Sequence, residues 1–264
     1  MKPLSEIETY LLDMDGTIYL SDYVYPCTLP FLSLLKEQGK RYIFLTNNSS
    51  TNKSAYLERL ARLGIPVDGD SVFTSGEATT IYLSSEKPGA RIYLCGTPDL
   101  EEEFRQAGFV LTDESPDYAV LGFDKTLTYE KLVRLCDFVR AGVPFIATHP
   151  DFNCPVTGGF IPDVGSMLAL VKASTGREPD YIVGKPNRGI VDALARKYAL
   201  PLDTMAMVGD RLYTDIAAGN RAGFVSIFVL SGEASLEDAQ RAVAEGNEEQ
   251  IRDLVFPSVA EIPV

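Results

Sequence analysis

The chain has 264 residues, of which 45% are hydrophobic and 23% charged, and its formal net charge is −13 from 24 Lys and Arg against 37 Asp and Glu. This length accommodates two domains, or one large domain with an insertion. The acidic balance repels nucleic acids and anionic membrane surfaces, so we expect neither as a partner. A phosphorylated substrate would need local positive charge, which a metal ion, a lysine and backbone N–H groups can supply.

The sequence predicts a location in a reducing compartment. It has four widely separated cysteines, with no Cys-x-x-Cys pair: Cys27, Cys95, Cys136 and Cys154. Residues 1–6 lack the apolar segment of a signal peptide, and no run of about 18 apolar residues could span a bilayer. We therefore expect a cytoplasmic protein. Zinc catalysis is not expected, since His149 is the only histidine and the cysteines lack ligand spacing.

Strand and helix patterns alternate along most of the chain. Short apolar runs predict strands at residues 7–12, 41–45, 72–74, 92–95, 119–121, 144–147, 181–183, 204–208, 224–229 and 254–256. Helical patterns lie between them at residues 29–36, 53–63, 79–84, 100–107, 129–141, 167–173, 190–198, 216–222 and 235–245. The segment 149–162 is rich in Gly and Pro and is expected to be a loop. This order predicts an α/β fold with a mostly parallel sheet covered on both faces.

Two carboxylates, Asp13 and Asp15, follow the first predicted strand and precede Gly16. Ligands of open α/β sheets bind beyond the carboxyl ends of the strands, so this pair is a candidate site for a hard cation. An ordinary Asp- and Gly-containing turn is the alternative. An EF-hand loop is excluded, because its seventh and twelfth positions would be Tyr19 and Val24.

Three further polar sets also follow predicted strands. The second is Thr46-Asn47-Asn48, for which a helix N-cap is the structural alternative. The third is Lys185, between Gly184 and Pro186, and the fourth is Asp210 with Asp215. A surface position is the ordinary alternative for a lysine. Four such loops in this order are difficult to assign to turns alone.

The chain resembles the haloacid dehalogenase-like (HAD) phosphohydrolases in four motifs: Asp13-Met14-Asp15-Gly16-Thr17, Leu45-Thr46-Asn47-Asn48, Gly184-Lys185-Pro186, and Gly209-Asp210 with Asp215. Within that family it is similar to the NagD/4-nitrophenylphosphatase branch, which carries a C2a-type cap between the second and third motifs. The resemblance implies a Rossmann-like, doubly wound catalytic core at residues 1–78 and 179–264, with an inserted α/β cap at residues 79–178. The usual Asn-Pro-Asp of the cap is replaced by His149-Pro150-Asp151.

The resemblance also implies a Mg²⁺-dependent phosphatase of small phosphomonoesters, such as sugar or nucleotide phosphates and 4-nitrophenyl phosphate. Asp13 would be the nucleophile that forms an aspartyl-phosphate, and Asp15 the acid and base. The implied metal group is Asp13, the Asp15 carbonyl and Asp210, with Asp215 orienting a metal-bound water or Lys185. The implied phosphoryl-binding residues are Thr46, Asn47, Asn48 and Lys185.

Asp151 is predicted to line the substrate face, because the loop around it can fold over the metal site; an ordinary loop position is the alternative. His149 is expected to be a loop or core histidine rather than a base. Self-association as a homodimer through the cap is compatible with the resemblance. Two other functions stay open: a phosphotransferase on the same scaffold, and a catalytically silent module that binds phosphorylated metabolites.

Overall fold

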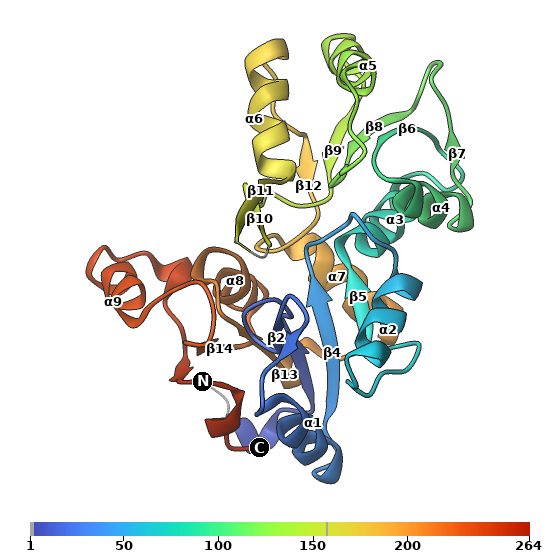
Figure 1. The fold of residues 1–264 in the computed structure, drawn as a ribbon. Helices are drawn as coiled ribbons and strands as arrows, with labels where there is room; N and C mark the ends of the chain where they lie inside the picture. Colours follow the sequence, from blue (N-terminus) through green and yellow to red (C-terminus); the bar gives the residue numbers. More distant parts are fainter. Residues whose placement is uncertain (1–2, 157) are drawn as a thin grey trace. The chain divides into compact units, whose positions relative to one another are not determined.

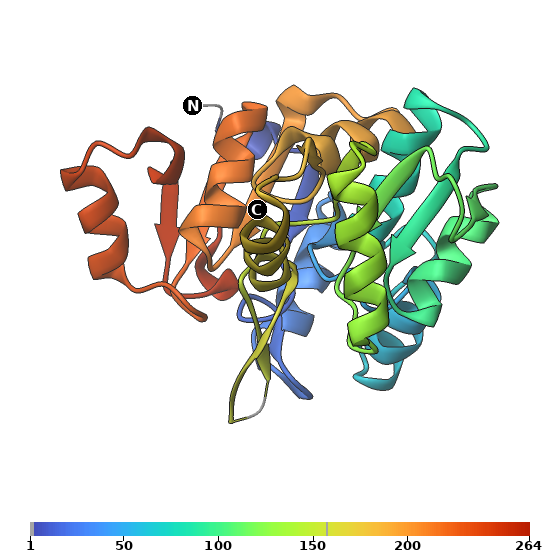
Figure 2. The same ribbon diagram turned by 90° about the horizontal axis from the view of Figure 1, so that it is seen from above.

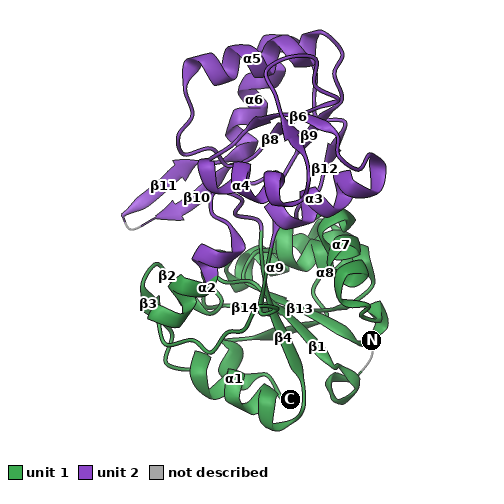
Figure 3. Ribbon diagram, turned by 90° about the vertical axis from the view of Figure 1, so that its right-hand side faces the viewer, with its two compact units in different colours: residues 1–46, 57–73, 185–264 green, residues 47–56, 74–184 purple. Residues whose placement is uncertain are grey.

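The computed structural model describes residues 3–156 and 158–264, which form two compact units (Figure 3). The first unit contains residues 1–46, 57–73 and 185–264, of which residues 1 and 2 lie outside the described part. The second contains residues 47–56 and 74–184. The division into a catalytic core at residues 1–78 and 179–264 and a cap at 79–178 stays a prediction, since compactness alone does not decide which residues act together.

The first unit is built on a six-stranded sheet (Figure 1). Its strands, in spatial order, are β15 (Leu254–Phe256), β14 (Val225–Val229), β13 (Met205–Gly209), β1 (Thr9–Leu12), β4 (Arg41–Thr46) and β5 (Val72–Thr74). The central strand β1 is parallel to both neighbours, with Leu12 opposite Val208 and Phe44. The carboxyl ends of β1, β4 and β13 therefore meet at one edge of the sheet.

Helices of the first unit cover both faces of this sheet. They are α1 (Thr28–Glu37), most of α2 (Lys53–Arg62), α7 (Arg188–Tyr198), α8 (Ala217–Ala222) and α9 (Leu236–Ala244). The chain passes from β1 through α1 to β4, but from β13 through α8 to β14 in the opposite direction. Right-handed crossovers consequently place α1 and α8 on opposite faces, which makes the sheet doubly wound. A small hairpin, β2 (Tyr19–Leu20) and β3 (Tyr23–Val24), follows β1.

The second unit has a parallel sheet and a core of its own. The strand order is β12 (Tyr181–Ile182), β9 (Phe145–Ala147), β8 (Tyr118–Leu121), β6 (Arg91–Cys95) and β7 (Val110–Leu111). Its helices are α3 (Ser75–Glu86), α4 (Pro98–Gln106), α5 (Tyr129–Arg140) and α6 (Val164–Thr175). Buried side chains such as Phe123, Leu135 and Phe145 form one cluster between sheet and helices. The predicted α/β fold with a doubly wound parallel sheet and a second α/β part is confirmed.

The segment 149–162 differs from its prediction as a loop, because it contains an antiparallel hairpin. Strands β10 (Asn153–Val156) and β11 (Gly159–Pro162) pair with each other, and Figure 2 shows this hairpin projecting from its own unit. Two prolines fit a two-stranded ribbon because a residue without an N–H can sit on a free strand edge. Residue 157 lies outside the described residues.

Two helices extend further than their apolar patterns predicted. Helix α3 begins at Ser75 rather than at residue 79, because the Thr74 hydroxyl accepts a hydrogen bond from the Glu77 N–H at 3.0 Å and caps it. Helix α6 begins at Val164, after the cap residue Asp163. Among the described residues, no helix is long and apolar enough to cross a membrane.

Candidate active site

The turn after β1 presents Asp13 and Asp15 at the carboxyl edge of the first unit's sheet. The Asp13 N–H donates to the Val208 carbonyl at 2.9 Å and continues the pairing with β13. The Gly16 N–H donates to the Tyr19 carbonyl at 2.8 Å, which closes the turn toward the β2–β3 hairpin. Gly16 has φ +94°, in the left-handed region where side chains are strained.

Lys185 reaches the same edge from the segment after β12. Its Nζ lies 2.5 Å from Asp13 Oδ1, 2.7 Å from Asp215 Oδ1 and 2.9 Å from the Leu45 carbonyl oxygen. The side chain is only 2% exposed. Burial lowers the pKa of Lys185, but Asp13 and Asp215 outweigh burial and raise it above its usual range. The lysine is therefore a fixed ammonium beside the Asp13 carboxylate.

Asp13, Asp210 and Asp215 bring three carboxylates together, with one oxygen of each within 4.8 Å of the others. Burial and the nearby Asp13 and Asp215 raise the pKa of Asp210 to about 7. Burial and Asp13 likewise raise the pKa of Asp215 to about 6, although Lys185 opposes this. A divalent cation relieves such repulsion, and an all-oxygen donor set suits Mg²⁺ or Ca²⁺.

Glycines leave space for the Asp210 carboxylate. A Cβ at Gly16 or at Gly232 would overlap its carboxylate atoms. The same carboxylate accepts hydrogen bonds from Thr17 Oγ1 at 3.1 Å and from the Glu233 N–H at 2.7 Å. Asp210 is thus held in one orientation by the first motif and by the loop after β14.

Asp15 has the electrostatic environment of an acid that keeps its proton to a higher pH than an ordinary aspartate does. Burial, followed by the charge of Asp13, raises the pKa of Asp15 to about 6, while Arg59 and Arg211 lower it. Arg59 on α2 donates from Nη2 to the Ser21 carbonyl at 2.8 Å, so it also ties α2 to the hairpin after β1.

Sequence reasoning missed both arginines. Arg211 immediately follows Asp210 and forms an ion pair with Glu233, with Nε 2.9 Å from Oε2. Its position next to a motif aspartate was a usable signal. Arg59 lies within an ordinary amphipathic helix, so its proximity to Asp15 depends on tertiary structure and left no signal in the sequence.

Thr46 ends β4 in the first unit and is buried, whereas Asn47, Asn48 and Asp151 belong to the second unit. The Asn47 side-chain amide donates to Asp151 Oδ1 at 3.1 Å and Oδ2 at 3.3 Å. Asn48 Oδ1 accepts from the Ser50 N–H at 2.9 Å, which makes a local turn. The structure thus brings Asn47 together with Asp151, and separately Asp13 with the residues around Lys185.

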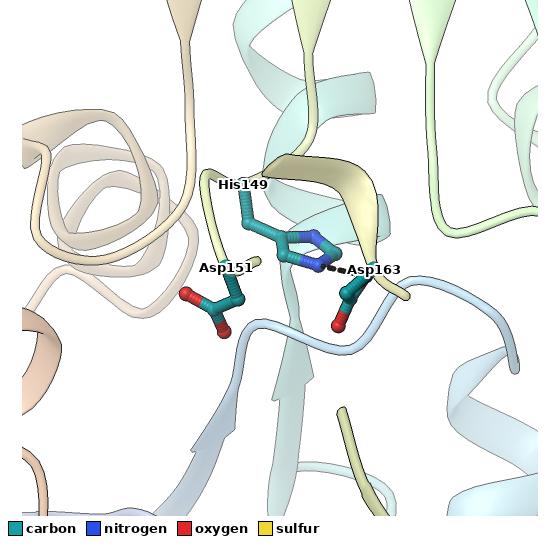
Figure 4. Close-up of side chains that lie close together, drawn as sticks. All are labelled: His149, Asp151 and Asp163. Atoms are coloured by element: carbon teal, nitrogen blue, oxygen red, sulfur yellow. Dashed lines mark hydrogen bonds and ion pairs between the residues drawn. The ribbon is translucent and has the colours of Figure 1, made fainter. Parts of the chain in front are cut away.

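His149 is a core histidine, as predicted, with no exposed surface. Figure 4 shows its ring between Asp151 and Asp163. These three residues also have ligand atoms within 4.8 Å of one another. However, His149 Nε2 hydrogen-bonds to Asp163 Oδ1 at 2.9 Å, and Asp151 accepts from Asn47. Hydrogen bonds within the second unit account for this group, so the carboxylate cluster around Asp210 is the better candidate metal centre.

Comparisons with known proteins point in one direction. A family model described as haloacid dehalogenase-like hydrolase matches residues 10–110, and one described as HAD-hydrolase-like matches residues 182–262. The chain is 36% identical over 238 residues to an acid sugar phosphatase of Staphylococcus aureus, covering 90% of this chain and 92% of that protein.

Solved structures with the same fold include two phosphatases. The 4-nitrophenylphosphatase from Thermotoga maritima is 49% identical, with a TM-score of 0.92 over 98% of this chain and 97% of that one. A glycerol phosphate phosphatase from Mycobacterium tuberculosis, solved in complex with magnesium, is 29% identical, with a TM-score of 0.89 over 98% of this chain and 78% of that one. The same enzyme has also been solved in complex with calcium.

Proposed function

The chain belongs to the haloacid dehalogenase-like hydrolases and is a phosphatase of small phosphorylated compounds; we propose that it acts through an aspartyl-phosphate on Asp13. The membership confirms the resemblance that the four motifs predicted, including the NagD/4-nitrophenylphosphatase branch. The observation that carries the proposal is the buried ion pair between Lys185 and Asp13, at the edge where Asp210 and Asp215 also lie.

In the proposed first step, Asp13 attacks phosphorus and the bond to the leaving oxygen breaks. Asp15 donates its proton to that oxygen, which the raised pKa of about 6 favours near neutral pH. In the second step Asp15 takes a proton from water, and the resulting hydroxide attacks the phosphoryl group. Inorganic phosphate leaves and the Asp13 carboxylate is restored. Lys185 offsets negative charge beside the reacting carboxylate in both steps.

We propose Mg²⁺ as the metal. Asp13, the Asp15 carbonyl and Asp210 would hold it, and Asp215 would orient a bound water or Lys185. The fit rests on the carboxylates of Asp210 and Asp215, whose pKa values are raised by burial and by neighbouring carboxylates, since keeping them charged costs free energy that a cation offsets. The ion supplies charge neutralisation for an incoming phosphate dianion. A magnesium complex of a 29% identical relative supports this choice.

Thr46, Asn47, Asn48 and Lys185 are proposed to bind the phosphoryl group, and Asp151 to line the substrate face. The substrates are proposed to be small phosphomonoesters such as sugar or nucleotide phosphates. Names of relatives support this class, since one is an acid sugar phosphatase and another a glycerol phosphate phosphatase. Residues 79–178 are proposed to act as the cap. A homodimer through that cap, a cytoplasmic location and the absence of nucleic acid or membrane partners are part of the same proposal.

The direct test is turnover of 4-nitrophenyl phosphate with Mg²⁺ and with a chelator, using Asp13→Asn as the control. We expect metal-dependent release in the wild type and none in the variant. Brief reaction and acid quench should leave acid-stable phosphate on the wild-type chain only. Absence of metal-dependent turnover would favour a binding module instead. Formation of new phosphoesters from added alcohols would favour a phosphotransferase, and a panel of phosphorylated metabolites identifies the substrate.

A further inference from the structure

The loop after β4 lies across the carboxyl ends of three strands of the second unit. The Ser50 carbonyl accepts from Thr97 Oγ1 at 3.0 Å, just beyond β6. Ser49 Oγ accepts from the Phe123 N–H at 2.9 Å beyond β8, and lies 2.9 Å from Thr148 Oγ1 beyond β9. Ligands commonly bind at this edge of a parallel sheet. In this unit the chain's own loop occupies the edge.

Asn47, at the start of that loop, is held through both its main chain and its side chain. Its carbonyl oxygen accepts from Ser75 Oγ, and its side-chain amide donates to Asp151. His149 is adjacent to both attachments, because its Nδ1 lies 3.4 Å from Ser75 Oγ and it precedes Asp151 by two residues. The imidazole of His149 therefore lies next to the two residues that hold Asn47, which is proposed to bind phosphate.

For a neutral imidazole, the hydrogen-bond partners of His149 assign its single ring proton. A carboxylate only accepts, so the contact between Nε2 and Asp163 at 2.9 Å requires the proton on Nε2. In the neutral ring Nδ1 must then accept, and Thr148 Oγ1 at 3.0 Å is its donor. Ser75 has already given its hydroxyl proton to Asn47, so it does not compete. The Nδ1 lone pair thus sets the direction of the Thr148 hydroxyl.

The same direction continues through the network. Because Thr148 donates to His149, Ser49 donates to Thr148, and the Phe123 N–H donates to Ser49. Every buried hydroxyl in this chain of contacts has one donor and one acceptor, which buried polar groups need. We call these consecutive hydrogen bonds from Phe123 through Ser49 and Thr148 to His149 the relay. Such a network rigidifies its side chains when every donor and acceptor in it has a partner. It runs from the helix cap at Asp163 to the loop that begins with Asn47.

We propose that His149 is a positioning residue that fixes the loop from Asn47 to Ser50 through its Nδ1 acceptor. This rests on the proposed function, in which Asn47 binds the phosphoryl group. His149 does not touch the substrate. Asp163 selects the ring tautomer, and Thr148 and Ser49 carry the effect to the loop. Small displacements of phosphate-binding groups reduce turnover strongly, since catalysis here is mainly positioning.

A matched pair of isosteric variants tests the relay. Thr148→Val removes a relay hydroxyl, whereas Thr79→Val removes an equally buried hydroxyl that donates only to the Ser75 carbonyl, at 2.6 Å. We expect Thr148→Val to lower kcat/KM for 4-nitrophenyl phosphate with Mg²⁺ about tenfold or more. Backbone hydrogen exchange at residues 47–50 should also accelerate. Thr79→Val should stay within about threefold of the wild type in both measurements.

Two replacements of His149 distinguish the contribution of Nδ1 from that of Nε2. Asn places an acceptor oxygen near the Nδ1 position, and Gln places a donor near Nε2. His149→Asn should therefore retain most of the activity, and His149→Gln should behave like Thr148→Val. If His149→Gln does not fold, the threonine pair still decides the question.

Equal behaviour of Thr148→Val and Thr79→Val in kcat/KM and in exchange would overturn the proposal, as would rescue by Gln rather than Asn. An inactive wild type would refute the proposed function instead. In that case the exchange rates at residues 47–50 still decide whether the relay positions the loop.

Discussion

Lys185 Nζ lies 2.5 Å from Asp13 Oδ1 in an ion pair whose lysine is 2% and aspartate 13% exposed. The two residues are 172 positions apart in sequence, so only the fold joins them. Asp215 holds the same ammonium at 2.7 Å. Removing one partner of a buried pair leaves an uncompensated charge, which costs about 3–5 kcal/mol of stability. Loss of Lys185 should therefore affect both the stability of the fold and the charge balance at the proposed nucleophile, Asp13.

Lys185→Met should lower both kcat and stability. Turnover of 4-nitrophenyl phosphate should fall about a thousandfold, because the variant loses a preorganised positive charge at the reacting group. The unfolding midpoint in urea should also fall. A matched control is Lys131→Met, since Lys131 pairs with the buried Asp124 at 2.6 Å in the second unit. That variant should lose stability but keep kcat, and equal loss of kcat in both would contradict the assignment.

Gly16→Ala should weaken activation by Mg²⁺, and this effect should exceed the one expected from backbone strain alone. The new Cβ would overlap the Asp210 carboxylate, in addition to the strain at φ +94°. Gly64→Ala is the matched control, because Gly64 has φ +76° and nothing within 4 Å of a new Cβ. Both variants should lose about 1 kcal/mol or more of stability. Only Gly16→Ala should raise the Mg²⁺ concentration needed for half-maximal activity, measured by metal titration.

The sequence predicted the parts of the site that follow strands, and missed those that depend on tertiary packing. Asp13 and Asp210 each come directly after an apolar run, and parallel pairing of β1 with β13 brings their segments to one edge. Lys185 also follows an apolar run, but that strand, β12, pairs with β9 in the second unit, so strand pairing does not account for the position of Lys185. Arg59 has no comparable marker, because a basic residue on an amphipathic helix is ordinarily a surface charge.

The region around His149 was harder to predict for a different reason. Gly and Pro residues usually indicate a loop, and the hairpin β10–β11 forms through pairing that this composition does not suggest. The proposed role of His149 depends on its neighbour Thr148 and on contacts with Ser75 and Asp163, which come from other parts of the chain. Contacts between residues that are distant in the sequence cannot be predicted from a local sequence pattern.

Metal-free protein should lose stability as the pH rises from about 4 to about 7. Burial and neighbouring carboxylates raise the pKa of Asp210 to about 7, so the folded state binds more protons than the unfolded state in this window. Ionising the cluster therefore disfavours folding. Mg²⁺ should reverse the loss, raising Tm by several degrees at pH 8 and little at pH 5.

Thermal unfolding with Mg²⁺ and with chelator measures this difference. Asp210→Asn should show a smaller pH dependence and a smaller Mg²⁺ increment at pH 8. Asp70→Asn, at an exposed site, should match the wild type. A metal increment that is equal at both pH values would contradict a site built from crowded carboxylates.

Arg59→Met should move the basic limb of the pH–activity profile to higher pH. Asp15 must be protonated to supply the leaving group, so kcat/KM should fall above its pKa, which burial and Asp13 raise to about 6. Arg59 lowers that pKa, and its loss should raise it. Arg62→Met, which removes an exposed arginine from the same helix, is the matched control and should leave the limb in place. Profiles of kcat/KM at fixed Mg²⁺ provide the measurement, because bound metal acts on all three proteins alike. A limb that moves downward in Arg59→Met, or equally in both variants, would show that the group titrating there is not Asp15.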